Sequence, residues 1–216
     1  ICKMLAESGV TLYLGYQKRF RSRVFQLKDK LPQIGGFYPL DVAQDATTKE
    51  FFDAFSAENP GKKADILIHA IGFAPRTCFD RPILFVEDQD INTAMTISAN
   101  SLQRCLKFAL PYLNPNSSTI TLTYAASNRY VPSYGIMSMA KAALECWTRE
   151  LACHLGPEGH RVNAISSGPI RTIAASGIPG FDNILNHVQN NSPLRRNVNQ
   201  DDVAGATLWL ASPLAS

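Results

Sequence analysis

The sequence predicts a doubly wound α/β domain, in which helices cover both faces of a mostly parallel sheet. Segments of strand character alternate along the chain with segments of helical spacing, as crossover connections between parallel strands require. The strand segments are apolar at successive positions, which is typical of strands buried on both faces. The length of 216 residues fits one domain, 1–216, better than two.

The first part of the chain predicts a helix end, a strand and a helix. Residues 1–8 have the pattern of a closing helix, and Gly9 stands where a helix C-terminus favours glycine. The apolar run Val10–Tyr16 predicts a strand, and Arg21–Leu31 has the spacing of a helix.

Two further strands enclose a helix in the next part. The second strand is expected at Gly36–Leu40 and ends at Asp41. Thr47–Phe55 follows as a helix, because its phenylalanines fall on one helix face. Ala64–Gly72, with the sequence ADILIHAIG, predicts a strongly buried strand that stops at a glycine. We expect His69, near its end, to be a structural residue.

The middle of the chain predicts two long helices on either side of a strand. Asp90–Tyr112 has helical spacing, and Thr119–Tyr124 is a β-branched strand. Pro132 then precedes a helix expected at residues 133–155, which a glycine–proline pair ends.

The last part predicts a fifth strand and a final helix. Arg161–Ile165 has strand character, and residues 168–191 are less regular because glycines and prolines interrupt them. Asp201–Ala211 is expected as the last helix, after a cap. In sheets of this kind, ligands bind beyond the carboxyl ends of the strands. The residues at those ends are Asp41, Ile71, Gly72, Phe73, Tyr124 and residues 166–170.

The composition argues against several classes of protein. The formal charge of +3 is too small and too scattered for a nucleic-acid partner. The five cysteines include no CxxC pair, which favours a reducing cytoplasmic compartment, and the four histidines lack metal-ligand spacing, so we expect no metal site. No apolar run reaches the length of a membrane span, and no signal peptide opens the chain.

The most informative segment is TYAASNRYVPSYGIMSMAK, residues 123–141. Tyr124 lies where a strand ends, Tyr134 at a predicted helix start, and Lys141 seven residues later. Seven helical steps of 100° make about two turns, so Tyr134 and Lys141 are expected on one helix face, roughly 10.5 Å apart along the axis. A ligand between them can meet the phenol at one end and the ammonium at the other.

This segment resembles the enoyl-[acyl-carrier-protein] reductase branch of the short-chain dehydrogenase/reductase superfamily. Most of that superfamily carries a Tyr-x-x-x-Lys pair, whereas this chain has six residues between Tyr134 and Lys141 and a second tyrosine ten residues earlier. Three other stretches are similar to the same branch: HAIGFAP, GPEGHRVNAISSGPIRTIAASGI and SPLRRNVNQDDVA. The resemblance covers essentially the whole chain and implies a Rossmann-like fold.

The resemblance implies reduction of the trans-2 double bond of an enoyl thioester in fatty-acid elongation. Tyr134 is then the donor to the thioester oxygen, on which negative charge develops, and Tyr124 orients the substrate or gates the pocket. Lys141 holds the ribose hydroxyls of the nicotinamide nucleotide. The implied contacts of the substrate are Phe73, Ala74, Met137, Ile178 and Phe181.

The same resemblance implies a nicotinamide cofactor. Its contacts are expected at Gln17, Asp41, Val42, Ile71, Gly72, Lys141, Ile170 and Thr172. Gln17 stands at the position that recognises the adenosine ribose, and Lys18 and Arg19 follow it in the sequence. An acid at that place favours NAD, and a basic cluster favours NADP. We expect NADH and keep NADPH open.

The remaining implications concern the substrate and partners. Residues 172–190 resemble a substrate-binding loop, which can be mobile when empty and then cover an acyl chain. The acyl group is expected to be carried as a thioester of acyl carrier protein, with coenzyme A left open as the carrier. The phosphopantetheine arm of the carrier can meet Arg171, Arg195 and Arg196. Homotetramers are common in this family, so we expect a homo-oligomer without nucleic-acid or membrane partners.

Two other functions stay open on the sequence alone. One is another reductase of the superfamily, such as a 3-oxoacyl or dienoyl-thioester enzyme, although the wide spacing of Tyr134 and Lys141 argues against the first. The other is a catalytically silent fold used for binding or assembly. Nucleotide titration distinguishes the silent fold, and a substrate panel distinguishes the two enzymes.

We also expect the chain to be part of a longer enzyme that lacks here its first strand–turn unit and its last strand. The glycine-rich phosphate turn is absent from the sequence, and so is the C-terminal strand with its Asp-Gly-Gly-like ending. The first strand of such a domain is central, so two neighbouring strands are expected to lack a partner. We expect roughly 25–30 further residues upstream, and an isolated chain that binds nucleotides poorly and melts without cooperativity.

Overall fold

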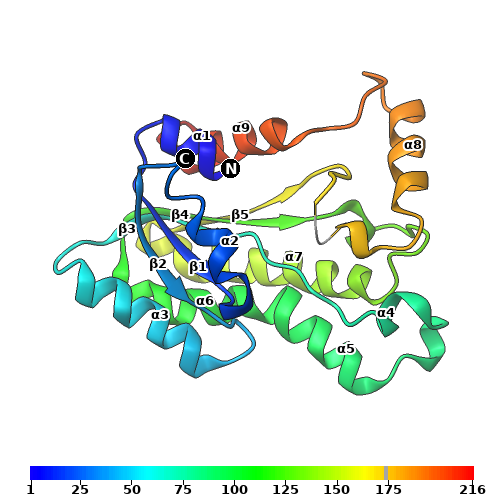
Figure 1. Ribbon diagram of the computed structural model, residues 1–216, viewed down its shortest axis with the longest axis horizontal. Coiled ribbons are helices and arrows are strands. Elements are labelled where there is room, and N and C mark those ends of the chain that lie inside the picture. Colours follow the sequence, from blue (N-terminus) through cyan, green and yellow to red (C-terminus); the bar gives the residue numbers. More distant parts are fainter. Residues whose placement is uncertain (173–174) are drawn as a thin grey trace.

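The computed structural model describes residues 1–172 and 175–216 and has the predicted α/β architecture (Figure 1). Its strands are β1 (Leu12–Tyr16), β2 (Ile34–Pro39), β3 (Ala64–His69), β4 (Leu113–Thr123) and β5 (Arg161–Ser166). All of their pairings are parallel, which confirms the parallel sheet that the sequence predicts. Among the described residues, no helix is long and apolar enough to span a lipid bilayer.

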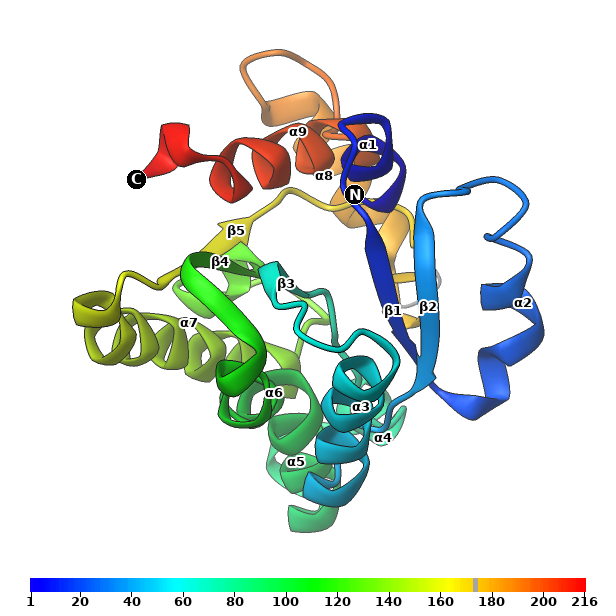
Figure 2. The ribbon, with the colours of Figure 1, turned by 90° about the vertical axis from the view of Figure 1, so that its left-hand side faces the viewer.

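The strands form two separate hydrogen-bonded groups. β1 pairs with β2, while β3, β4 and β5 form a three-stranded sheet in that order. β1 and β3 each have one hydrogen-bonded neighbour and do not pair with one another in the described part of the chain, as Figure 2 also shows. The expectation that two neighbouring strands lack a partner is therefore confirmed. Side chains bridge the opening, because Leu14 of β1 and Ile68 of β3 pack against the same apolar cluster.

Helices cover both faces of the strands (Figure 2). The longer helices are α1 (Cys2–Glu7), α3 (Asp45–Glu58), α5 (Asp88–Met95), α6 (Ser101–Ala109), α7 (Ile136–Leu155), α8 (Phe181–Asn191) and α9 (Gln200–Ala211). α1 and α9 lie against one face, where Leu5 and Ala6 pack with Leu12 and Ile34. α3, α6 and α7 lie against the other face and enclose the main core.

Shorter elements complete the fold. Two are one-turn helices, α2 (Arg21–Phe25) and α4 (Thr77–Asp80), and a π-helical turn at Thr96–Asn100 joins α5 to α6. Short 3₁₀ turns lie at Lys18–Phe20, Ile83–Phe85, Leu110–Tyr112, Ala125–Ser127, Gly156–Glu158, Ala175–Gly177 and Pro213–Ala215.

Local end signals place several helix boundaries correctly. Gly9, with φ +85°, follows α1, and its amide and that of Val10 bond to carbonyls of the last helical turn. Asn199 caps α9 with its side chain, and its own amide donates a hydrogen bond to the carboxylate of Asp202. The single long helix predicted at residues 90–112 is present as α5, the π-helical turn and α6.

Three predicted elements differ from the structure. The helix expected at Arg21–Leu31 ends at Phe25 and continues as turns, because none of the residues Arg21–Phe25 is fully buried. The strand at 64–72 ends at His69, and its apolar residues before His69 are half-buried, since β3 has no strand on one side. Residues 181–191, expected to be irregular, form α8 on an apolar face that includes the buried Leu185.

Candidate active site

Two tyrosines face each other where β4 ends. Tyr124 follows the last residue of β4, and Tyr134 lies in the turn before α7. Their ring centroids are 4.9 Å apart, with an angle of 46° between the ring planes. Tyr134 is 8% exposed, and its burial raises the pKa of the phenol above the ordinary value. Burial raises the pKa of Tyr124 as well. Both phenols therefore stay protonated near neutral pH and can donate a hydrogen bond.

Lys141 lies on α7 and is buried beside the ends of β3 and β4. Its ammonium donates a hydrogen bond of 2.7 Å to the carbonyl oxygen of Leu122. Burial lowers the pKa of Lys141 to about 8, and the carboxylate of Glu145 acts in the opposite direction. A Cβ atom on Gly72 would lie 3.9 Å from Nζ of Lys141. The glycine therefore leaves space for a ligand beside the ammonium.

The helix-face geometry predicted for Tyr134 and Lys141 is wrong. α7 begins at Ile136, so Tyr134 precedes the helix and the seven-residue spacing does not set its direction. Gly135 makes the turn with φ +51°, and a Cβ atom there would lie 2.6 Å from the carbonyl oxygen of Cys78. The tyrosine thus reaches the site from a turn, whereas the lysine reaches it from the helix.

Most of the residues predicted to contact substrate gather around the tyrosines. Met137 belongs to the buried cluster that contains Tyr134, and Ala74 and Ile178 pack against that cluster. Phe73 follows Gly72 and is 43% exposed, so its ring is available to a ligand. Phe181 begins α8 and is not among the side chains packed on this cluster in the described residues.

Gln17 and Asp41, which were predicted to contact the adenosine part of the nucleotide, lie just after the carboxyl ends of β1 and β2. Gln17 and Asp41 line one pocket of about 650 Å³, together with Lys18 and Arg19. The side-chain oxygen of Gln17 accepts a 3.0 Å hydrogen bond from Nε of Arg19. A carboxylate oxygen of Asp41 accepts one of 3.1 Å from the amide of Ala43, which fixes the turn that carries the buried Val42.

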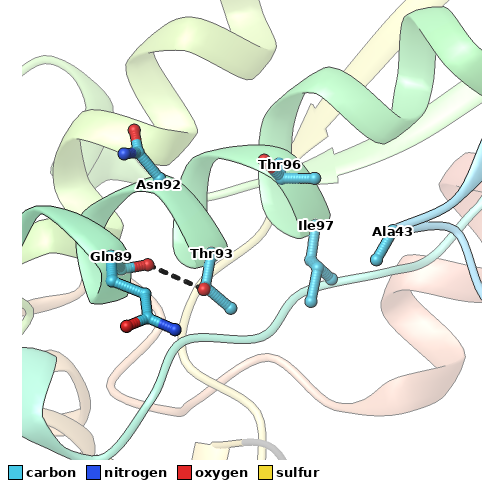
Figure 3. A pocket seen from close by; sticks show the side chains of 6 residues that line it. All are labelled: Ala43, Gln89, Asn92, Thr93, Thr96 and Ile97. Carbon is cyan, nitrogen blue, oxygen red and sulfur yellow. Dashed lines mark hydrogen bonds between the residues drawn. The ribbon is translucent and has the colours of Figure 1, made fainter.

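A second pocket, of about 470 Å³, lies next to this turn (Figure 3). Ala43 and Ile97 form its apolar part, and polar side chains from α5 and the following turn line the rest. The polar residues are Gln89, Asn92, Thr93 and Thr96. None of these four residues was predicted as a site residue, although their spacing of three, four and seven residues marks one polar helix face.

His69 is held in a closed network, in agreement with the structural role expected for it. It is 1% exposed, and its ring nitrogens lie 2.9 Å from Oγ1 of Thr121 and 2.8 Å from Oγ of Ser101. The hydroxyl of Ser101 also donates to the carbonyl oxygen of Ile97, and that of Thr121 to the carbonyl oxygen of His69, so both hydroxyls are fixed around the ring. Burial, with the nearby Lys141 charge, lowers the pKa of His69 to about 3, and the ring is therefore neutral.

The segment after β5 is described except for residues 173 and 174. Within the predicted substrate-binding loop, 172–190, these two lie outside the described residues. Ile170 is half-buried, and the exposed Thr172 accepts a 3.1 Å hydrogen bond from the amide of Ala175. Arg171 forms an ion pair of 2.7 Å with Asp182 on α8.

The other two arginines suggested for the phosphopantetheine arm are also engaged. Arg196 forms an ion pair of 2.7 Å with Asp202. Arg195 donates a hydrogen bond to the carbonyl oxygen of Asn190. Their side chains are solvent-exposed, so each arginine can exchange its partner for a ligand at low cost.

Comparison with known proteins gives consistent matches. A family model described as "Enoyl-(Acyl carrier protein) reductase" matches residues 1–216. The chain is 40% identical to the enoyl-[acyl-carrier-protein] reductase [NADH] FabI of Haemophilus influenzae, over 100% of this chain and 82% of the relative. It is 37% identical to the FabI protein of Escherichia coli, again over 100% of this chain and 82% of the relative.

Solved structures of similar proteins agree with the fold. The enoyl-acyl carrier protein reductase of Bacillus cereus, solved with NADP+ and an indole naphthyridinone, has a TM-score of 0.95 and 34% identity, covering 100% of this chain and 84% of that one. The reductase of Anaplasma phagocytophilum, solved with NAD, has a TM-score of 0.91 and 33% identity, covering 100% of this chain and 79% of that one.

Proposed function

Because the chain belongs to the enoyl-[acyl-carrier-protein] reductase family of short-chain dehydrogenases/reductases, we propose that Tyr134, Lys141 and Tyr124 carry its chemistry. The chain is an enoyl-[acyl-carrier-protein] reductase, which reduces the double bond of an enoyl thioester with NADH in fatty-acid synthesis. The observation that carries the assignment of residues is the contact between the buried Tyr134 and the half-buried Tyr124 at the end of β4, where the buried Lys141 bonds to the carbonyl of Leu122.

The residues at the strand ends fit a nicotinamide nucleotide. The Lys141 ammonium has three N–H groups, and one of them bonds to Leu122, which leaves two for the hydroxyls of a ribose. Gly72 carries no side chain where the nucleotide would pass the ammonium. Gln17 and Asp41 share a pocket at the other end, where the adenosine would lie. NADH, when bound, supplies the hydride for the β-carbon of the substrate.

Tyr134 acts on the thioester oxygen in this proposal. Negative charge develops there as the double bond is reduced, and a protonated phenol aimed at it stabilises the transition state more than the ground state. The raised pKa of Tyr134 keeps its proton in place near neutral pH. Tyr124, with its ring 4.9 Å from that of Tyr134, restricts where the acyl group can lie.

Lys141 has a positioning and electrostatic role. Its ammonium would hold the nicotinamide ribose and keep the potential positive near the developing negative charge. Ile71, Ile170 and Thr172 are proposed to contact the same nucleotide, since they follow β3 and β5 at the same edge of the sheet. Phe73, Ala74, Met137, Ile178 and Phe181 are proposed as the walls of the acyl site.

Membership of this family also supports proposals about the oligomeric state of the protein and its location in the cell. A homotetramer is common in this family, and sedimentation of the purified protein would test it. A cytoplasmic location is supported by the cysteines, because all five are unpaired in the structure. The acyl carrier protein is the proposed thioester handle, with Arg171, Arg195 and Arg196 as its phosphate contacts.

The test of this assignment is turnover of a crotonyl thioester by the active enzyme, followed at the absorbance band of reduced nicotinamide. Tyr134→Phe should lower kcat by about 10²–10³, which is typical for loss of one transition-state donor, while NADH binding stays nearly intact. Lys141→Ala should also weaken NADH binding. Wild-type turnover by the phenylalanine variant would show that another group donates to the thioester oxygen.

A further inference from the structure

We propose that Ser98 is a positioning residue of this reductase, because its buried hydroxyl holds the main chain of Phe73 beside Met137 and Lys141. In this way it shapes the wall against which the enoyl chain and the nicotinamide end of the cofactor bind. The inference rests on the proposed function, since it takes Phe73 and Met137 as substrate contacts and Lys141 as a cofactor contact.

The hydrogen bonds of Ser98 are concentrated on one residue. Oγ of Ser98 accepts from the amide of Phe73 at 2.8 Å and donates to the carbonyl oxygen of Phe73 at 2.7 Å. Ser98 is 0% exposed. One hydroxyl therefore satisfies both polar groups of a main chain that has left β3 and, among the described residues, pairs with no strand there.

The same hydroxyl reaches α7. Its oxygen lies 3.6 Å from Sδ of Met137, and a Cβ atom on Gly72 would lie 3.9 Å from Cε of Met137 and 3.9 Å from Nζ of Lys141. Ser98 is thus in contact with the loop after β3 and with the helix that carries the lysine. A change at Ser98 alters the separation of these two walls.

The helix that carries Ser98 is irregular at this place. Thr96–Asn100 forms a π-helical turn between α5 and α6, and such turns occur frequently at functional sites. Ser98 and Ser101 both point inward from this region, and Ser101 bonds to His69 at the end of β3. The segment from His69 to Phe73 is consequently held at both ends by one helix.

Holding the segment from His69 to Phe73 at both ends has a physical consequence for binding. Gly72 and Phe73 are exposed, and an exposed segment without strand partners is free to sample several conformations. When the walls of a site are already ordered, ligand binding does not have to pay the entropy cost of ordering them. Ser98 supplies that order from the protein interior, out of reach of solvent and without touching substrate.

The test uses the active enzyme with a crotonyl thioester and NADH. Ser98→Ala removes both hydrogen bonds to Phe73, so kcat/KM for the thioester should fall by about tenfold to hundredfold, as expected when a wall of the site is displaced. Ser98→Cys keeps a similar volume but bonds weakly, and its loss should lie between those of wild type and alanine. The Kd for NADH should change by less than the kcat/KM for the thioester.

Ser118→Ala is the matched control. Ser118, in the middle of β4, is 1% exposed, and its hydroxyl donates a 2.9 Å hydrogen bond to the carbonyl of Leu210 on α9, away from the tyrosines at the strand end. It should lose a similar amount of stability and keep wild-type kcat/KM. If Ser98→Ala matches this control, the inference is overturned, and if the alanine variant does not fold, wild-type kcat/KM in Ser98→Cys overturns it equally.

Tyr134→Phe, measured beside these variants, separates the inference from the proposed function. If Tyr134→Phe loses turnover while Ser98→Ala behaves like Ser118→Ala, only the positioning role fails. If Tyr134→Phe keeps wild-type turnover, the assignment of the catalytic residue fails instead.

Discussion

The environment of Lys141 makes its charge depend on pH in the working range. Burial disfavours the ammonium, and only Leu122, through its carbonyl, and Glu145, through its charge, oppose that effect among the described residues. His69 on β3 is neutral and adds no charge, and the phenols of Tyr124, after β4, and Tyr134, before α7, are protonated. Lys141 is therefore the group near the nicotinamide end whose charge changes first as the pH rises.

We predict that kcat/KM falls as the pH rises through about 8, the lowered pKa of Lys141. The sign follows from the requirement for the charged form, which is present below that pKa and lost above it. The measurement is a pH profile of kcat/KM for the thioester, which reports groups of the free enzyme. Lys141→Arg keeps the charge to much higher pH, so a decline at the same pH in this variant would assign it to another group.

The basic pair beside Gln17 gives a prediction about the cofactor. Lys18 and Arg19 are exposed, and Arg19 is engaged with Gln17 and lies 4.8 Å from the centroid of the Phe20 ring. We expect changing Lys18 and Arg19 together to alanine to change the KM for NADH and for NADPH by similar factors, because solvated charges do not select a 2′-phosphate. A rise confined to NADPH in steady-state kinetics would instead show that the pair reads that phosphate.

At the scale of elements, the turn between Tyr134 and α7 is the most constrained part of the site. Gly135 has φ +51°, a conformation that residues with a Cβ atom adopt with strain, and the main chain of Cys78 on α4 occupies the space of that atom. The turn holds the phenol in place because α4 and the start of α7 pack on the same cluster, which includes Cys78 and Ile136.

We predict that Gly135→Ala lowers the free energy of unfolding by about 1–3 kcal/mol, since it adds backbone strain and a clash with a carbonyl. It should also lower kcat, because relief of the clash moves Tyr134. Gly156→Ala is the matched control at the other end of α7, where φ is −57° and a Cβ atom meets nothing within 4 Å. Urea denaturation and turnover check both variants, and equal effects at the two glycines would contradict the prediction.

At the scale of the whole molecule, the strands fall into two hydrogen-bonded groups joined by side chains. The group β3–β4–β5 has its own core against α6 and α7. The pair β1–β2 packs on a smaller cluster with α1 and α9, and on its other face against α3. Main-chain hydrogen bonds make a sheet cooperative, and none joins the two groups in the described residues.

We predict that this chain unfolds in more than one step. The smaller group should melt first, so the calorimetric enthalpy should exceed the van't Hoff enthalpy in differential scanning calorimetry. Hydrogen exchange should show weaker protection in Leu12–Tyr16 than in Thr119–Thr123. Equal enthalpies together with uniform protection would mean that side-chain packing alone couples the two groups.

Much of the fold follows from local patterns. The caps at Gly9 and Asn199 are readable because each is a contact between residues a few positions apart, and the five strands are readable because their apolar residues form continuous short runs. Helix α8 and the early end of α2 were not predicted, since burial against distant residues decides whether such short amphipathic segments hold a helix.

By itself the sequence predicted the enzyme family that the comparisons confirm, because the spacing of Tyr134 and Lys141, the second tyrosine at 124 and three further motifs all resemble that family. Only the tertiary structure decided how those groups meet. The approach of Tyr124 to Tyr134, the opening between β1 and β3 and the hold of Ser98 on Phe73 depend on contacts between separate elements. No local spacing encodes such contacts, because they arise only when the helices and strands have packed together.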